Sequence, residues 1–241
     1  LPVEHPIQKL FAVLQLELGY SEQALLSFDK LQGLSSPDSK LLQTASMQFT
    51  QQGDREAAEN LLGKAIELTP NDAKLSAMAG ALKVIQGDQS GIEDLEKAIQ
   101  LDPDLLDANF ALAIIYLKQN EIVKAQNVVT QWSESNDKDN DNVHLVQGFI
   151  YSFQDKLELA KASFELAMQT NPNNYAALFN ISLIAEKESQ FTKAIEGYKK
   201  VLKSIPSHRK SLAGLIRVGR STQQEKDVLA FLQSLDTNEQ V

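Results

Sequence analysis

Cysteine is absent from the 241 residues, which excludes disulfides, thiolate nucleophiles and cysteine metal sites. Aromatic residues are also scarce, at 7% against 43% hydrophobic residues in total. This balance favours helices packed through small contacts over a sheet built from aromatic and β-branched pairs. The longest apolar run, residues 110–117, is much shorter than the roughly 20 residues that a membrane-spanning helix needs. We therefore predict an all-α protein with no direct membrane span.

Positive charge is in short supply as well. The chain holds 23 Lys and Arg against 32 Asp and Glu, a net charge of -9, so its average surface would repel a phosphate backbone. Nucleic acid is therefore not among the predicted partners. Nothing near the N-terminal end resembles a signal peptide, and the chain begins at Leu1, so we expect a processed form or a piece of a longer protein.

Motifs that carry chemistry are missing too. The sequence has no GxxxxGK[ST], GxGxxG or GxSxG. Asp137, Asp139 and Asp141 alternate as in a calcium loop, but Asn142 and Gly148 occupy the positions that need Gly and a bidentate Glu. The histidines lack the helical spacing of a metal site: His5, His144 and His208. We predict no enzyme activity, no catalytic residue, no cofactor and no metal site.

What the sequence does contain is a repeat of about 34 residues. Prolines recur with spacings of 33, 33, 69 and 34 at Pro37, Pro70, Pro103, Pro172 and Pro206. Small residues recur with the same period at Ala24, Ala58, Gly91, Ala125, Ala160 and Ala194, with Val228 in the last unit. Four residues later, and so on the same helical face, stand Phe28, Leu62, Leu95, Val129, Phe164, Tyr198 and Leu232. A further small register lies eleven or twelve residues before the first one, at Ala12, Ser46, Gly80, Ala113, Gly148 and Ser182. Each unit is therefore predicted to be a helical hairpin closed by proline.

These registers resemble the tetratricopeptide repeat, a 34-residue helical hairpin. The best units are LSAMAGALKVIQGDQSGIEDLEKAIQLDPD and VHLVQGFIYSFQDKLELAKASFELAMQTNPNN. The large aromatic residue that begins a family repeat is missing from every unit, so the resemblance depends on seven units in phase. It implies an α-solenoid of about seven hairpins that forms a right-handed superhelix.

The resemblance also implies a single solenoid domain over residues 1–241. Its units are predicted to start near residues 5, 39, 73, 106, 141, 175 and 209. The junction at 133–142 replaces the proline turn with a longer polar loop after Trp132, and we expect a bend there. The alternative is that Trp132 packs under this loop with no change of direction.

In proteins that this chain resembles, the first helix of each hairpin lines an inner groove. Carried onto the fourth, fifth and sixth units, the ligand-contacting positions are apolar: Phe110, Ile114, Leu117, Leu145, Phe149, Phe153, Phe179 and Leu183. An exposed apolar surface of this kind favours a groove for an apolar or amphipathic segment. The alternative is a register shifted by one residue, or a curvature that buries these side chains.

Towards the C-terminal end the inner positions become basic, at Lys187, Lys210, Arg217 and Arg220. This basic lip is predicted to attract an acidic peptide or a C-terminal carboxylate; a solvated face without a partner is the alternative. The clamp that binds chaperone tails in some relatives is incomplete, because Leu145, Phe149 and Gly214 stand at its required polar positions. Chaperone tails are therefore not predicted ligands.

The leading functional prediction is a non-catalytic scaffold that binds a partner protein or peptide in the groove. Two alternatives are a structural subunit of a bacterial envelope, secretion or polysaccharide-export system, and a regulatory or targeting arm of a larger enzyme. Homo-oligomerisation and the compartment are left open, with the bacterial envelope slightly favoured over the cytoplasm.

Overall fold

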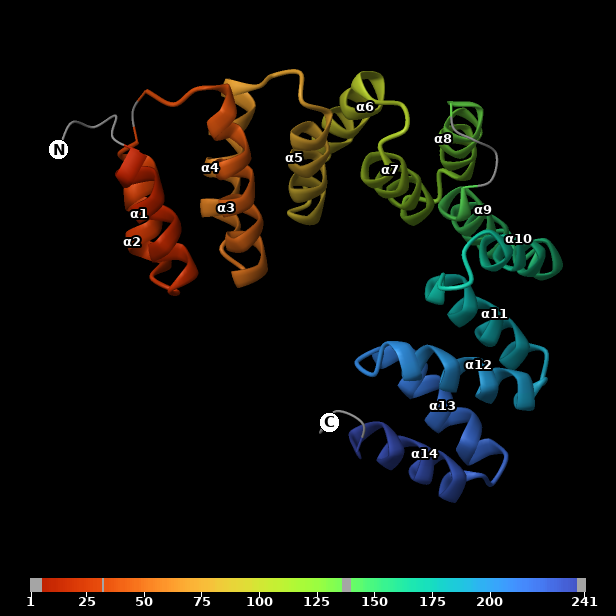
Figure 1. Ribbon diagram of the computed structural model, residues 1–241. Helices are drawn as coiled ribbons and strands as arrows, with labels where there is room; N and C mark the ends of the chain where they lie inside the picture. Colours follow the sequence, from red (N-terminus) through yellow and green to blue (C-terminus); the bar gives the residue numbers. More distant parts are fainter. Residues whose placement is uncertain (1–5, 32, 136–139, 238–241) are drawn as a thin grey trace. The chain divides into compact units, whose positions relative to one another are not determined.

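The structure is a computed structural model that describes residues 6–31, 33–135 and 140–237 (Figure 1). Within these ranges the chain forms fourteen α-helices, one short 3-10 helix and no strand, which confirms the predicted all-α class. The helices are α1 (Pro6–Glu17), α2 (Ser21–Asp29), α3 (Ser39–Gln52), α4 (Arg55–Leu68), α5 (Ala73–Ile85), α6 (Gly91–Leu101), α7 (Leu106–Lys118), α8 (Ile122–Ser135), α9 (Asp141–Phe153), α10 (Leu157–Thr170), α11 (Tyr175–Lys187), α12 (Phe191–Ser204), α13 (Arg209–Ser221) and α14 (Glu225–Thr237), with the 3-10 helix η1 at Ser36–Asp38.

The helices follow one another as seven pairs, and each pair is joined by the same kind of turn. One residue in every turn has a positive φ: Gly19, Gly53, Gly87, Asn120, Asp155, Ser189 and Gln223. Glycine adopts this left-handed conformation without strain, whereas other residues do so at a cost of about 1 kcal/mol. The repeat thus keeps its backbone geometry even where the sequence no longer supplies glycine.

Short polar side chains begin several of the helices. The Asp54 carboxylate accepts a hydrogen bond from the Ala57 amide at the start of α4, and Asp72 accepts from the amides of Lys74 and Leu75 at the start of α5. These bonds satisfy amides that have no partner within the first turn of a helix. The caps therefore fix where each helix begins.

The chain divides into two compact units, residues 1–112 and 113–241, with the boundary inside α7. The first unit has a core of small and branched side chains, with Phe28 and Phe49 fully buried in it. The second has a core in which Tyr198 and Leu202 are fully buried beside Leu215. The prediction of one solenoid domain over residues 1–241 stays a prediction.

The small residues of the repeat lie where two helices come closest. A Cβ atom on Gly80 of α5 would stand 2.5 Å from the Gly91 carbonyl oxygen of α6 and 2.8 Å from Leu95 Cγ. In the second unit, a Cβ on Gly148 of α9 would collide with the buried Phe164 ring of α10. The recurring pairing of a small with a large residue is therefore a packing requirement of each hairpin.

The predicted bend at 133–142 has its middle, residues 136–139, outside the described residues. Beside it, Trp132 is buried. At the start of α9, the Asp141 carboxylate accepts hydrogen bonds from the side-chain amides of Asn171 at 2.8 Å and Asn174 at 2.9 Å. Of the three aspartates that alternate as in a calcium loop, Asp137 and Asp139 lie outside the described residues.

Candidate partner-binding surface

The predicted apolar groove starts with residues of the fourth hairpin, and none of these is fully exposed. Phe110 belongs to the first unit and Ile114 to the second, and each is half-buried. Leu117 is a core side chain of the second unit, 1% exposed. A partner cannot reach Leu117 in this structure, so it leaves the candidate surface.

The fifth hairpin contributes α9, on which only the last predicted residue is open. Leu145 is buried, because this face of α9 is turned towards its neighbours in the core. Phe149, one turn later, is half-buried and meets the Phe164 ring edge-on, with ring centroids 5.7 Å apart. Phe153, at the C-terminal end of α9, is 55% exposed. Phe153 is therefore the apolar contact that α9 offers to a partner.

In the sixth hairpin, Phe179 of α11 connects three elements and does not lie open. Its ring centroid is 6.0 Å from that of Tyr198 on α12 and 5.1 Å from that of His208, the residue before α13. Leu183, one turn further along α11, is half-buried. Phe179 therefore stabilises the packing of α11, and both residues leave only part of their surface to a partner.

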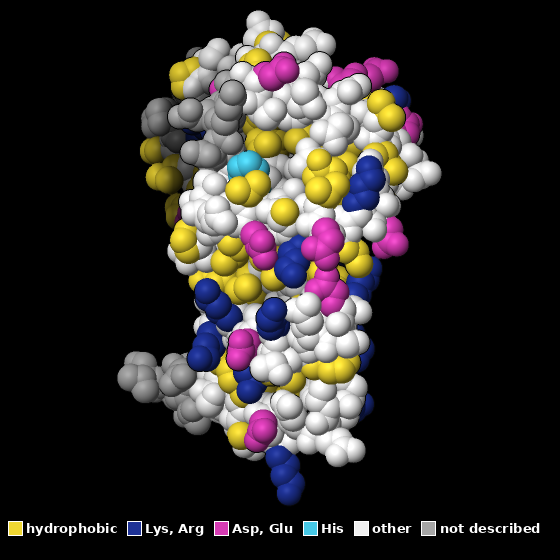
Figure 2. Space-filling model, turned by 90° about the vertical axis from the view of Figure 1, so that its right-hand side faces the viewer, with side chains coloured by type: hydrophobic (Ala, Val, Ile, Leu, Met, Phe, Trp, Pro, Cys, Tyr) yellow, Lys and Arg dark blue, Asp and Glu magenta, His cyan; other side chains and the backbone are white. Residues whose placement is uncertain are grey.

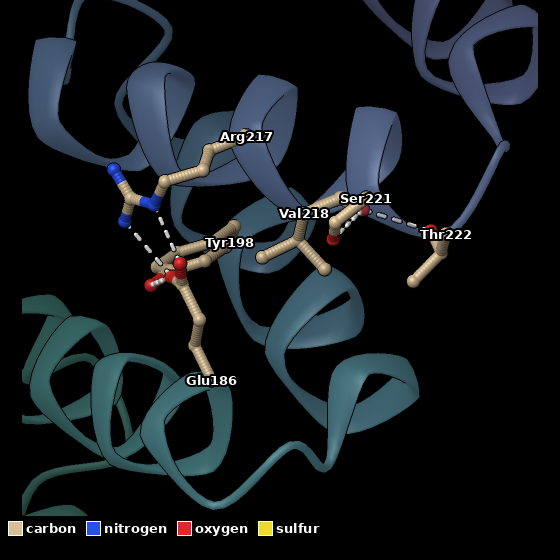
Figure 3. A network of polar contacts seen from close by, with 6 residues as sticks. All are labelled: Glu186, Tyr198, Arg217, Val218, Ser221 and Thr222. Atoms are coloured by element: carbon tan, nitrogen blue, oxygen red, sulfur yellow. Dashed lines mark hydrogen bonds and ion pairs between the residues drawn. The ribbon is translucent and has the colours of Figure 1, made fainter.

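A polar network joins the helices α11, α12 and α13 of the second unit (Figure 3). The Glu186 carboxylate accepts hydrogen bonds from Arg217 Nε at 2.5 Å and Arg217 Nη2 at 2.9 Å, and from the Tyr198 hydroxyl at 2.7 Å. The hydrogen bonds from Arg217 hold the pKa of Glu186 below its usual range against the opposing effect of burial. Burial, aided by the nearby carboxylate, raises the pKa of Tyr198, so its hydroxyl stays protonated and donates.

Because of this network, the cations of the predicted basic lip differ in whether they are free to bind a partner. Arg217 forms an ion pair with Glu186, although the Arg217 side chain is 56% exposed. Lys187, Lys210 and Arg220 are exposed, and within the part of the chain that the structure describes none of them forms an ion pair. We refer to Lys187, Lys210, Arg217 and Arg220 together as the cationic surface.

A shallow open hollow of about 670 Å³ lies on α13, and two of these cations, Arg217 and Arg220, line it. Its wall consists of Ala213, Ile216, Arg217, Arg220 and Ser221. The hollow therefore combines an apolar side chain with two guanidinium groups. The sequence pattern did not single out Ile216, although it lies within four residues of both arginines.

The cationic surface belongs to a segment whose charge opposes that of the rest. Residues 175–241 hold ten Lys and Arg against seven Asp and Glu, whereas residues 1–174 hold 13 against 25. Figure 2 shows basic side chains gathered over the lower part of one face, at the height of α11–α14 in Figure 1 and next to hydrophobic ones. Counting charge by segment would have found this asymmetry in the sequence.

Two smaller hollows in the first unit were not predicted. They lie between α3 and α5, have volumes of about 270 and 320 Å³, and share Met47, Met78 and Ala81 in their walls. Both are predominantly apolar, and Met47 is largely exposed. The signal in the sequence was the placement of two of the three methionines at inner positions of successive hairpins.

The described residues contain no cluster of three or more His, Asp or Glu side chains that could hold a metal ion. Among the same residues, no helix combines the length and the apolar content needed to cross a membrane.

Comparison with known proteins agrees with this architecture. Family models described as tetratricopeptide repeat match residues 89–148, 142–174 and 175–208. A TPR repeat-containing protein of Methanocaldococcus jannaschii is 26% identical over 50% of this chain and 29% of its own length. The uncharacterized protein ycf37 of Pyropia yezoensis is 32% identical over 43% of this chain and 61% of its own length. The matches thus span less than two thirds of either relative.

Among solved structures, Pseudomonas aeruginosa pilF superposes with a TM-score of 0.65 at 18% identity, covering 83% of this chain and 91% of that one. An identity this low shows the fold alone. The fold and the matched repeats define a helical-hairpin repeat protein. The chain belongs to the tetratricopeptide-repeat family.

Proposed function

We propose that this chain is a non-catalytic scaffold that holds an acidic segment of a partner protein against the cationic surface of its second unit. The tetratricopeptide-repeat fold is that of a protein-interaction scaffold, and its family is generally non-catalytic. The observation that carries the finer proposal is that Lys187, Lys210 and Arg220 are exposed and form no ion pair with any described residue, within a chain of net charge -9.

Charge supplies the first part of the recognition. Exposed cations attract an acidic segment and speed its association, an effect that salt screens. Arg217 contributes less than the other three, because the carboxylate of Glu186 already neutralises it. Arg220 has no such partner in the described chain and lies in the wall of the hollow on α13.

Apolar contacts supply the second part. Ile216 in the hollow and Phe153 at the end of α9 offer apolar surface on first helices of the second unit. A segment in which acidic residues alternate with leucine or phenylalanine matches both kinds of contact. The proposed ligand is therefore an acidic, amphipathic peptide segment, with no requirement for a free C-terminus.

The experiment measures binding of a fluorescent peptide rich in Glu and Leu by anisotropy, at low and at physiological salt. Lys210→Glu and Arg220→Glu should each weaken binding about fivefold, corresponding to about 1 kcal/mol for an exposed charge pair. Lys226→Glu on α14 makes the same change of charge at another exposed lysine of the second unit. We expect this control variant to bind with nearly the affinity of the wild type.

Equal losses in all three variants would mean that only net charge matters, and would contradict a defined surface. No binding of the acidic peptide by the wild type at low salt would contradict the proposal outright. The same assay with a peptide carrying Lys in place of every Glu, and with a DNA duplex, tests the class of ligand. Both should fail to bind; tight binding of the duplex would overturn the proposal in favour of nucleic acid.

A further inference from the structure

The two hollows of the first unit adjoin, because the walls of both include Met47, Met78 and Ala81. We refer to them together as the α3–α5 groove. Along α5 its wall runs from Lys74 to Ile85, a length of about 16 Å at the rise of an α-helix. The wall residues of α5 recur at spacings of three and four, as do those of α3, so each helix turns one face to the groove.

Small side chains keep the α3–α5 groove open. Ala81 lies in the wall of both hollows and Ala77, one turn earlier, in the wall of one; a larger side chain at either position would occupy the space. Met47 is 48% exposed and Ile85 63% exposed, so the groove presents apolar surface to solvent. Methionine is unbranched and flexible, and therefore adapts to the side chain that it receives.

The net negative charge of the chain belongs to the first unit. Residues 1–112 hold eight Lys and Arg against 17 Asp and Glu, whereas residues 113–241 hold 15 of each. The groove wall itself carries one charge of each sign, at Lys74 and Asp107. The field of the surrounding unit therefore attracts a positively charged ligand.

Acidic side chains also lie near the Ile85 end of the groove. The side-chain amide of the next residue, Gln86, donates a hydrogen bond to the Glu59 carboxylate at 3.4 Å, and Asp88 follows in the turn after α5. Neither Glu59 nor Asp88 forms an ion pair with a described residue. Both carboxylates are therefore open to cations that flank a bound apolar segment.

We propose that the α3–α5 groove binds a basic amphipathic helix of a partner protein. The apolar face of that helix places leucine-sized side chains in the two hollows, and its Lys and Arg side chains face the acidic surface around them. About three turns of helix match the length of the groove. The site lies in the other unit from the cationic surface, and its ligand has the opposite charge.

The walls of the groove favour a helix over an extended segment. A helix forms its backbone hydrogen bonds internally, whereas an extended segment would bury amide and carbonyl groups against apolar side chains without partners. The volumes favour side chains over a whole small molecule. At about 270 and 320 Å³, each hollow is at or below the small end of the range for small-molecule pockets.

Fluorescence anisotropy with the full 241-residue chain tests the proposal. The labelled peptide has about 14 residues, or four helical turns, with leucines spaced three and four apart, lysines on the opposite face and alanine elsewhere. We expect binding at low salt that weakens at physiological salt. A peptide of the same composition in which leucine and lysine alternate cannot gather its leucines on one helical face and should fail to bind. The same expectation applies to the Lys counterpart of the alternating acidic segment above.

Two substitutions in the wall shared by both hollows test the location. Met47→Lys places a cation there, and Ala81→Phe fills the space without a change of charge; each should weaken binding at least tenfold, because an apolar anchor of the peptide loses its place. Leu26→Lys is the matched control for Met47→Lys, since Leu26 on α2 is 57% exposed and lies in neither wall. It should bind the peptide as the wild type does.

Asp107→Lys tests the contribution of charge and should weaken binding about fivefold, as expected for an exposed charge pair. Glu22→Lys, at an exposed residue of α2 outside both walls, makes the same change of charge and should bind with nearly wild-type affinity. Far-ultraviolet circular dichroism checks that each variant retains its helices. If Ala81→Phe does not, the exposed position of Met47→Lys decides the location.

The proposal would be overturned if the wild type bound the helical peptide no better than the alternating one, or if Met47→Lys left binding unchanged. Equal binding of a helical peptide with serine in place of lysine would refute the need for positive charge. A fluorescent fatty acid that binds where the peptide does not, and is lost in Ala81→Phe, would assign the groove to a small apolar ligand. Ala81→Phe should still bind the acidic peptide of the second unit, so each of the two sites stands or falls by its own assay.

Discussion

Gly80→Ala perturbs the closest approach of two helices in the first unit. The new methyl group would lie 2.5 Å from the Gly91 carbonyl oxygen and 2.8 Å from Cγ of the fully buried Leu95. The first of these obstacles is backbone, so no side-chain rotation relieves it and α5 must move away from α6. Overpacking of this kind costs about 1–3 kcal/mol, and we place this substitution near the upper end of that range.

Helix propensity acts in the opposite direction, because alanine is favoured over glycine by about 1 kcal/mol inside a helix. The net expectation is a loss of about 2 kcal/mol. Gly63→Ala is the matched control: it also lies inside a helix, α4, and a methyl group there meets no atom within 4 Å. That variant should be more stable than the wild type by about 1 kcal/mol.

Urea denaturation followed by far-ultraviolet circular dichroism measures both changes. Repeat arrays need not unfold in one step. The urea midpoint of the first unfolding transition that a variant shifts is therefore compared with the midpoint of the same transition in the wild type. If Gly80→Ala were as stable as the wild type while Gly63→Ala gained stability, the close contact of α5 with α6 would be refuted.

Two further changes test the second unit. Tyr198→Phe removes the hydroxyl that donates to Glu186 and should lower the free energy of unfolding by about 1.5 kcal/mol; an unchanged urea midpoint would contradict that hydrogen bond. His208 accepts a hydrogen bond from the Ser211 amide at the start of α13, and burial, followed by repulsion from Lys210, lowers the pKa of His208. The resulting stability is fully present above the ordinary pKa of 6.5 and is lost as pH falls through the lower folded-state pKa. His208→Asn keeps a cap acceptor and should abolish this pH dependence in thermal melts; a dependence that persists would assign it to another group.

The all-α class and the hairpin repeat could be predicted because their physical cause recurs in the sequence. Small residues at fixed spacing indicate where helices must approach, and Gly80 against Gly91 and Gly148 against Phe164 show that approach. Turn geometry was less visible. Ser189 has a positive φ, as Gly53 does at the matching turn, but nothing in its residue type indicates it.

The exposure of single side chains could not be predicted. A position in the repeat gives the direction of a side chain to within about one residue, but burial depends on which neighbouring helix fills the space beside it. Leu145 is therefore buried, while Phe153, eight residues later on the same helix, is exposed. The hydrogen bond from Arg217 to Glu186 joins the first helices of successive hairpins, and the two residues are 31 positions apart in the sequence. Local sequence patterns do not predict contacts between residues so far apart.

The central claim is that first helices of the second unit hold an acidic partner segment. Photo-crosslinking in the source cells tests it most directly, with a photoreactive amino acid at Ala213 in the wall of the α13 hollow, or at the exposed Leu166 on the second helix α10. We predict a protein adduct at Ala213 that Arg220→Glu abolishes, and that the crosslinked peptide is acidic. An adduct formed at Leu166 and not at Ala213 would contradict the account.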